Sequence, residues 1–319
     1  MNFKFKHIAI GALSAALSLP FLAQGAVFTF DPTGGGGGIA NVAVIDQSAG
    51  NALAQGGVTA INNSISGAGS TGFTLYYQAN LSILQFADTS VAFANGSGGN
   101  FFTFVSGFGE TVVNAEAFPG TASFAFDNSN PVNFFNMYAT SGVGNNLTGE
   151  GFISGAPILQ AHIVSVPTSN FQVTNTTPVD LDQSPNGNQW GAQDTVTGGG
   201  LSDIVLVIDS VNAGYFPSLD TGSQVLFSFF NTSQVDPFKQ IDPSRCFNSL
   251  GGDCGLGGGI TSEGTLGPVN GLNSGGPNFI FQADGNQSIT TIPEPASLAL
   301  IGLGLSFMGF FSRSRRRLE

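Results

Sequence analysis

The chain has one histidine away from its ends, His162, within the segment Ile158–Val166. A hydrolase that uses histidine as a general base needs a nucleophile and a carboxylate beside it. No serine of this chain lies in a Gly-x-Ser-x-Gly turn, which would mark such a nucleophile. His162 alternates with Gln160 and Val164, so we interpret it as a residue on the more polar face of a strand.

Two glutamates, Glu110 and Glu116, share one face if residues 110–118 form a strand. Glycoside hydrolases need two carboxylates about 5–10 Å apart. Along one strand these two would be separated by about 20 Å, so they do not form such a pair. Pairs across strands, among Glu150, Glu263 and the aspartates, stay open at this stage. We expect most acidic residues on the solvated face and in turns.

Four side chains with oxygen atoms alternate around a glycine, at Asp180, Asp182, Asn186 and Asn188. This spacing begins like a calcium loop, which needs six to eight oxygen ligands. It lacks the glutamate that ends an EF-hand loop, and Pro185 interrupts the alternation. An Asx-rich turn without metal is the competing interpretation, because Asp and Asn favour turns by themselves. No other cofactor is predicted.

Trp190, the single tryptophan, lies in a loop-like segment and could stack on a sugar ring. A lone tryptophan more often packs within a core or a loop. Tyr76 and Tyr138, which we expect to be exposed, are the other candidates for stacking on sugar.

The two cysteines, Cys246 and Cys254, lie close together in the sequence. A metal site would need further ligands, and the chain between its ends has one histidine and no other cysteine. An exported chain meets an oxidising compartment, so we predict a disulfide between them. Closing so small a loop stabilises a fold by roughly 2–3 kcal/mol in the chain-entropy model.

The elements that must position these residues are strands. Apolar residues alternate at Phe73, Leu75 and Tyr77, and the same period of two recurs at 122–126 and 225–229. Residues 203–209 are apolar almost throughout, which favours a central strand covered on both faces. We predict an all-β body over residues 27–286, an antiparallel two-sheet sandwich resembling a jelly roll. The run Gly34–Gly38 is expected to be a flexible loop, since no Lys-Ser/Thr follows it.

Residues 1–26 have the three parts of a secretory signal peptide, with Lys4 and Lys6 before the apolar run 8–23. Small residues follow the run, so we predict that signal peptidase cleaves near Gly25 or Ala26.

The other end carries Pro293-Glu294-Pro295 and then the uncharged segment 296–311. We predict that this segment forms a transmembrane helix, although it is slightly shorter than the ~20 apolar residues of a typical span. Four arginines follow it, Arg313, Arg315, Arg316 and Arg317. Arginines stay on the cytoplasmic side, so the body is expected outside and the tail inside.

This order of motif, apolar helix and arginine cluster over residues 293–319 resembles the PEP-CTERM sorting signal. The resemblance implies processing by an exosortase, a membrane enzyme resembling a transpeptidase, in a Gram-negative bacterium that makes exopolysaccharide, biofilm or flocs. It implies transient anchoring in the inner membrane, followed by release to the cell surface or extracellular matrix. Residues 287–292 are the predicted linker between the body and this signal.

Three segments of the body, 133–138, 149–155 and 229–238, look like parts of flocculation-associated PEP-CTERM proteins. That resemblance implies a role in holding cells and exopolysaccharide together, and it implies no catalytic residues.

Removing both ends leaves Lys239 and Arg245 as the basic residues, against 18 acidic residues between positions 27 and 292. The net charge of this part is therefore about −16, compared with −12 for the whole chain. Such a body repels nucleic acid, because it cannot neutralise phosphates with lysine or arginine. Neutral polysaccharides, divalent cations and cationic polymers are compatible partners.

The sequence therefore favours a structural or adhesive protein of the cell surface or matrix, without enzymatic activity. A lectin-like module that stacks sugar on its aromatic residues is the alternative, and an extracellular glycosidase is a third. An aromatic groove with two carboxylates at its base would favour the glycosidase.

The calcium interpretation and the turn interpretation of residues 180–188 predict different melting curves. A calcium site predicts a higher melting temperature in calcium than in chelator, because a ligand that binds only the folded state stabilises it. Calorimetry of the exported protein in both buffers measures this difference. Superimposable curves would leave the Asx-rich turn as the explanation.

Overall fold

The computed structural model describes residues 27–117, 120–146, 151–180, 194–232 and 277–288. The predicted signal peptide and C-terminal helix lie outside the described residues. Within the described ranges, no helix is both long and apolar enough to cross a membrane.

The described residues form twelve strands, one short α-helix and one 3₁₀ turn. The strands are β1 (Phe28–Phe30), β2 (Ile39–Gln47), β3 (Gly50–Gln55), β4 (Gly72–Phe86), β5 (Val91–Ala94), β6 (Phe101–Ala115), β7 (Thr121–Phe126), β8 (Asn133–Thr140), β9 (Ala156–Asp180), β10 (Asp194–Val211), β11 (Gln224–Thr232) and β12 (Phe279–Ser288). The helix is α2 (Gly57–Ser66) and the 3₁₀ turn is η1 (Ser97–Gly99). The all-β prediction is confirmed for this part of the chain.

All pairings between these strands are antiparallel, and they join the twelve strands into one sheet. Eight strands form a continuous circuit of hydrogen-bonded neighbours, in the order β4, β3, β12, β11, β10, β9, β8, β6 and back to β4. The ladder therefore returns to its own start, and it leaves no open edge among these eight strands.

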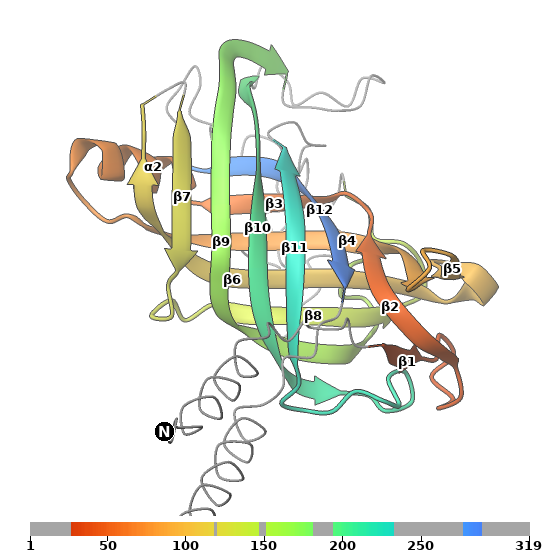
Figure 1. The fold of residues 1–319 in the computed structure, drawn as a ribbon. Helices are drawn as coiled ribbons and strands as arrows, with labels where there is room; N and C mark the ends of the chain where they lie inside the picture. The colour runs from red at the N-terminus through yellow and green to blue at the C-terminus, as the bar shows by residue number, and fades with distance from the viewer. Residues whose placement is uncertain (1–26, 118–119, 147–150, 181–193, 233–276, 289–319) are drawn as a thin grey trace, which may run out of the picture.

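Figure 1 shows β9, β10 and β11 running steeply across β4, β6 and β8. Hydrogen bonds connect these two crossing sets of strands into one sheet, where we predict a sandwich of two sheets. The long strands make this connection: β9 has 25 residues and pairs with β8 near its start and with β10 along most of its length. Strands that bend and change partners are a known way to turn a corner between crossing layers.

The predicted strand faces are confirmed. Phe73, Leu75 and Tyr77 of β4 are buried together in the main core, and so are Val225 and Phe227 of β11. The apolar strand predicted at 203–209 is part of β10, which is central because it pairs with both β9 and β11. β12 continues through Ser288, so the last strand of the body extends two residues into the predicted linker.

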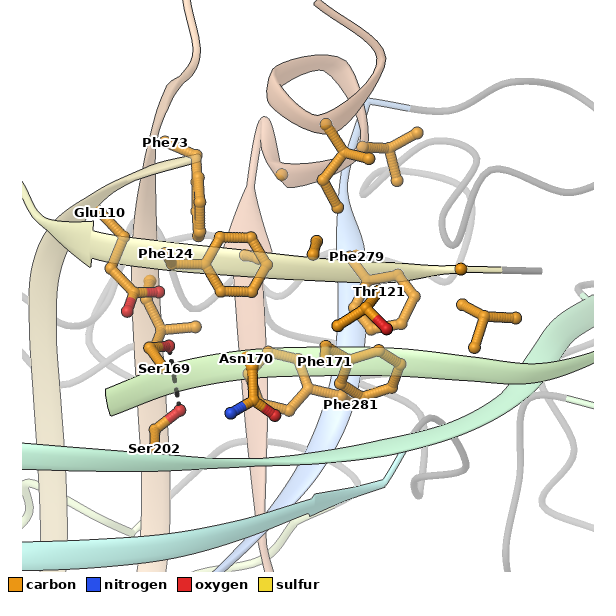
Figure 2. A pocket seen from close by; sticks show the side chains of 18 of the residues that line it. Phe73, Glu110, Thr121, Phe124, Ser169, Asn170, Phe171, Ser202, Phe279 and Phe281 are labelled. Carbon is orange, nitrogen blue, oxygen red and sulfur yellow. Dashed lines mark hydrogen bonds between the residues drawn. The ribbon is translucent and has the colours of Figure 1, made fainter. Parts of the chain in front are cut away.

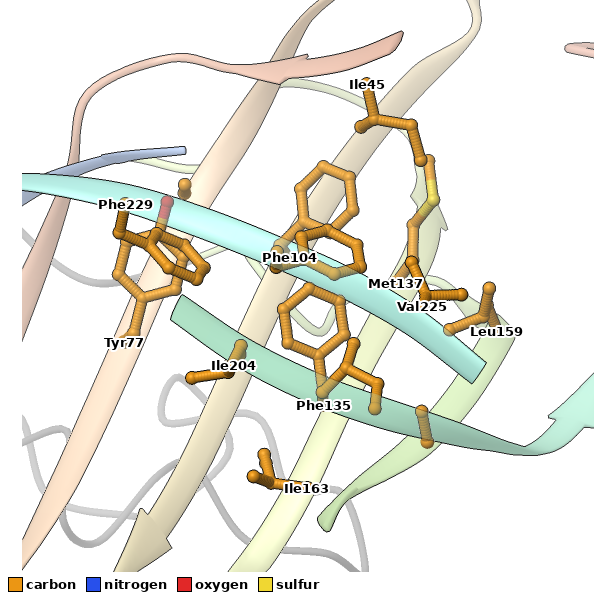
Figure 3. Close-up of a cluster of buried hydrophobic side chains, with 14 of the residues drawn as sticks. Ile45, Tyr77, Phe104, Phe135, Met137, Leu159, Ile163, Ile204, Val225 and Phe229 are labelled. Atoms are coloured by element: carbon orange, nitrogen blue, oxygen red, sulfur yellow. The ribbon is translucent and has the colours of Figure 1, made fainter. Parts of the chain in front are cut away.

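Phenylalanine rings fill the space between the two layers (Figure 3). Phe135 of β8 lies at the centre, with its ring centroid 4.7 Å from Phe227 and 6.0 Å from Phe104. A second group surrounds Phe30 of β1, whose ring lies 5.0 Å from Phe216. Rings of this size are suited to a wide interior, because each aromatic side chain typically buries about 150–250 Å² of its surface.

A segment after β8 covers part of the outer surface of the sheet. Phe152 is completely buried there, in a second cluster with Tyr76 and Tyr138. The Asn80 side chain holds the segment, because it donates to the Gly144 carbonyl at 2.9 Å and accepts from the Gly144 N–H at 2.7 Å. Tyr76 and Tyr138 are only 6% and 5% exposed, so the prediction that they are exposed is wrong.

The glycine run after β1 forms an ordered turn around a buried carboxylate. Asp31 accepts hydrogen bonds from the Thr33 N–H and hydroxyl, and from the Gly37 N–H at 2.8 Å. The hydrogen bonds from Thr33 lower the pKa of Asp31. Gly34 and Gly38 have positive φ angles of 71° and 108°, which only glycine adopts easily. The run is therefore needed for a defined turn, where we had expected a flexible loop.

Replacing Phe135 by alanine should lower the free energy of unfolding by about 3–5 kcal/mol, because it removes a fully buried ring and leaves a cavity. Urea unfolding followed by circular dichroism measures the loss. Val113→Ala is the matched control, since Val113 is 64% exposed and its truncation should change stability by less than about 0.5 kcal/mol. Equal losses for the two variants would contradict the described core.

Candidate functional site

A cavity lies inside the body, at the end where α2 packs beside the sheet (Figure 2). The cavity has a volume of about 70 Å³, which is enough for several water molecules or a small ligand. Most of its wall is apolar and comes from segments far apart in the sequence. Among the lining residues are Val58 and Ile61 of α2, Phe73 of β4, Phe124 of β7, Phe171 of β9, and Phe279 and Phe281 of β12.

The buried polar residues of the wall are three, and they come from three strands. Glu110 of β6, Ser169 of β9 and Ser202 of β10 all line the cavity and are at most 8% exposed. Figure 2 shows the Glu110 carboxyl beside Phe124 and above the two serines. The serine hydroxyl oxygens lie 3.2 Å apart and share a hydrogen bond. Oε1 of Glu110 has no hydrogen-bond partner among the residues that the structure describes.

Burial has a large effect on the titration of this carboxyl. Desolvation raises the pKa of Glu110 from 4.5 to about 7, while its hydrogen bond with Ser169 acts in the opposite direction. Desolvation dominates because no cationic side chain of the described residues lies beside the carboxyl. At neutral pH, Glu110 is therefore divided between a neutral acid that donates a hydrogen bond and a carboxylate that accepts one.

A second cavity of about 20 Å³ continues into the core. It shares Leu75, Ser202 and Phe281 with the first one. Ser202 therefore lies at the boundary between the two spaces, so the polar group is in the interior and not at the mouth of the site.

Glu110 is an exception to the expectation that most acidic residues lie on the solvated face or in turns, because it is 2% exposed. The signal that could have placed it inside is the period of two in β6. Phe104, Phe108 and Val112 all point into the main core, and Glu110 has the same parity. The alternation alone therefore places this carboxyl inside.

Glu116 also lines the cavity, but it is an exposed residue just beyond the end of β6. Six positions separate it from Glu110, which corresponds to about 20 Å of extended chain. The two carboxyls thus lie at different ends of the cavity. They do not have the spacing of about 5–10 Å that glycoside hydrolysis requires.

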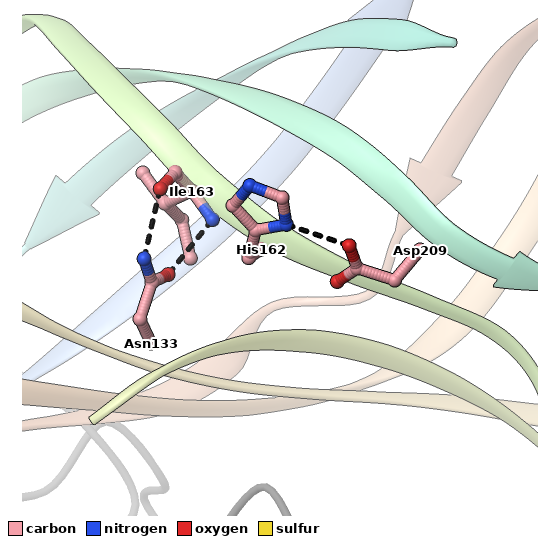
Figure 4. A network of polar contacts seen from close by, with 4 residues as sticks. All are labelled: Asn133, His162, Ile163 and Asp209. Atoms are coloured by element: carbon pink, nitrogen blue, oxygen red, sulfur yellow. Dashed lines mark hydrogen bonds and ion pairs between the residues drawn. The ribbon is translucent and has the colours of Figure 1, made fainter. Parts of the chain in front are cut away.

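His162 lies on β9 as predicted, and it is 40% exposed. Its Nδ1 atom is 2.8 Å from Oδ1 of Asp209 on the neighbouring strand β10 (Figure 4). Next to this pair, the Asn133 side chain donates to the Ile163 carbonyl and accepts from the Ile163 N–H, at 2.9 Å and 2.8 Å. These contacts connect strands, and within the described residues no group of three or more His, Cys, Asp or Glu side chains is placed to hold a metal.

The comparison with protein families concerns the C-terminal end of the chain. A family model described as the PEP-CTERM protein-sorting motif matches residues 291–317. The chain carries a PEP-CTERM sorting motif. No curated protein and no solved structure matches this chain.

The PEP-CTERM match covers the predicted motif Pro293-Glu294-Pro295 and the four arginines from Arg313 to Arg317. The motif directs export and exosortase-dependent sorting, with anchoring in the membrane before cleavage. The sequence prediction of this sorting signal is confirmed. The matched residues lie outside the described part of the structure.

Other predicted sites also lie outside the described residues: Asp182, Asn186, Asn188, Trp190, Cys246 and Cys254. Asp180 is the last residue of β9, and its backbone pairs with Asp194 at the start of β10. The disulfide and the calcium site stay predictions.

The buried carboxyl makes stability depend on pH. The folded protein holds a proton on Glu110 up to about pH 7, whereas the unfolded chain releases it near its ordinary value of 4.5. The folded state therefore binds more protons between these values, so its stability falls as pH rises through this window. The shift corresponds to at most roughly 3 kcal/mol.

Glu110→Gln should remove this part of the pH dependence, because glutamine does not titrate. Between pH 4.5 and pH 8 the wild type should lose up to roughly 3 kcal/mol more stability than the variant, as measured by urea unfolding. Burial also raises the pKa values of Asp46 and Asp284, but both proteins keep these residues, so the difference isolates Glu110. Parallel stability profiles would show that the Glu110 pKa is not raised.

Proposed function

We propose that this protein is a non-catalytic structural component of the bacterial surface or extracellular matrix, which associates with exopolysaccharide in biofilms or flocs. The observation that carries the proposal is the PEP-CTERM sorting motif at residues 291–317. A protein with this motif acts outside the cytoplasm, and its partners must be found there.

The proposed route follows the order of the segments. Signal peptidase removes residues 1–26, the helix at 296–311 holds the chain in the inner membrane, and Arg313, Arg315, Arg316 and Arg317 stay on the cytoplasmic side. Exosortase then acts at the sorting signal, and the body is transferred to the surface or the matrix.

The charge of the body supports an uncharged partner. The described residues contain no lysine and no arginine. His162 is the only basic side chain among them, and it already contacts Asp209. Anionic partners such as nucleic acid would meet only like charge over the described surface. Neutral polysaccharide requires hydrogen-bonding side chains instead, and the chain is rich in asparagine, serine and threonine.

The segments that resemble flocculation-associated proteins contribute several residues to the core. Residues 134–138 of β8 are all buried, and Phe152 and Phe229 belong to the two hydrophobic clusters. The resemblance in these segments therefore supports a shared fold, and it says nothing of a shared ligand surface. The flocculation role depends on the sorting motif and on the character of the body.

Two alternatives are weaker. The glycosidase hypothesis would require a close carboxylate pair, and Glu110 and Glu116 line the cavity at positions about 20 Å apart along the chain. Tyr76 and Tyr138 are both buried, so neither can stack on a sugar at the surface as the lectin hypothesis requires. Its remaining candidate is Trp190, whose replacement by alanine would test it directly.

Deletion of the gene should reduce floc or biofilm formation, and the wild-type gene should restore it. A variant with alanine at Pro293, Glu294 and Pro295 should fail to restore it, because its body should stay with the membrane fraction. Surface display is measured by immunolabelling of intact cells, and aggregation by sedimentation.

Two controls separate sorting from function. Val113→Ala, a change at an exposed apolar residue of β6, should be displayed and should restore aggregation. Normal aggregation of the deletion strain would refute the matrix role, whereas normal surface display of the triple-alanine variant would refute the sorting route.

A further inference from the structure

The interior cavity has a polar group that the fold itself leaves incompletely bonded. Glu110 is 2% exposed, and its Oε1 atom has no hydrogen-bond partner among the described residues. Buried polar atoms are nearly always paired, because an unpaired one loses the hydrogen bonds that water gave it. An unpaired carboxyl oxygen beside an empty space is therefore a place where a ligand can make the missing bond.

The wall of the cavity determines the rest of the ligand. Phe73, Phe124, Phe171, Phe279 and Phe281 surround the space, and Figure 2 shows the rings of the last three gathered at the end away from Glu110. Phe171 and Phe279 lie 5.0 Å apart in an edge-to-face arrangement. An aromatic or short aliphatic body fits such a wall, because aromatic rings favour offset or edge-to-face contacts.

Charge excludes an anionic end group. The described residues include no lysine or arginine, and His162 is an exposed residue that contacts Asp209. A carboxylate or phosphate next to Glu110 would find no counter-charge there and would repel the ionised carboxyl. A hydroxyl group avoids this conflict, because it donates to the carboxylate form of Glu110 and accepts from the protonated form.

We propose that this cavity binds a small, uncharged apolar molecule that ends in a hydroxyl group. The apolar body lies among the phenylalanine rings, and the hydroxyl group contacts Oε1 of Glu110 near Ser169 and Ser202. The cavity volume of about 70 Å³ limits the ligand to a short chain or a single ring. This inference is independent of the matrix role and of the sorting route.

Benzyl alcohol, toluene and benzoate are suitable probes, because they share one ring and differ in the end group. Calorimetric titration of the exported protein should give binding of benzyl alcohol and of toluene, and no binding of benzoate at the same concentrations. The ratio of the toluene Kd to the benzyl alcohol Kd measures how strongly the protein recognises the hydroxyl group.

Glu110→Leu should lower this ratio about tenfold, as expected for the loss of one hydrogen bond to a buried group. Glu110→Gln keeps a hydrogen-bonding end and should change the ratio less than about threefold. Gln78→Leu is the matched control, because Gln78 is also fully buried, its amide atoms have no hydrogen-bond partner among the described residues, and it does not line the cavity. It should leave the ratio unchanged.

The proposal is wrong if the wild type binds neither benzyl alcohol nor toluene, if benzoate binds as well as the alcohol, or if Glu110→Leu leaves the ratio unchanged. It is also wrong if Gln78→Leu lowers the ratio as much as Glu110→Leu. Should leucine at position 110 prevent folding, nuclear Overhauser contacts in the wild type decide the question. Benzyl alcohol should then show contacts with the Ala122 and Val58 methyl groups, which line the cavity; their absence would refute the site.

Discussion

Closure of the antiparallel ladder is the constraint on which the rest of this structure depends. β4 pairs with β6 on one side and β3 on the other, and eight strands continue from there until the circuit is complete. Closure satisfies the backbone hydrogen bonds of strands that would otherwise form exposed edges. It also encloses a wide space between crossing layers. Phenylalanine rings such as Phe135, Phe104 and Phe227 fill the middle of that space, where each large ring buries much apolar surface.

The same closure explains the unusual site at the end of the interior. Every second residue of β6 points inward, and such a residue is buried whether it is apolar or charged. Turning it outward would shift the register of the whole strand. Glu110 occupies such a position and is therefore buried. Ser169 compensates part of its lost hydration through a hydrogen bond, and Ser202 shares a hydrogen bond with Ser169 because β9 and β10 are neighbours in the same circuit. Oε1 of Glu110 keeps hydrogen-bonding capacity that no described residue uses.

The sorting motif and the folded body occupy different parts of the chain. The sorting motif occupies residues 291–317 and follows the last strand, β12, which ends at Ser288. The body in turn has the character that its destination requires, with a large excess of acidic over basic residues and a sheet whose eight circuit strands have no open edge. Both features oppose uncontrolled association outside the cell.

The sequence by itself determined what depends on local, contiguous signals. The PEP-CTERM tail could be recognised from the order of its parts, and the strand faces from a period of two, as with Phe73, Leu75 and Tyr77. Only the tertiary structure decided which strands pair, because periodicity defines a face and not a partner. It also decided burial at positions where distant segments meet. Tyr76 and Tyr138 are covered by the segment that contains Phe152, and Glu110 meets serines about 60 and 90 positions later in the chain. No local pattern contains these contacts, since they arise only when the ladder closes.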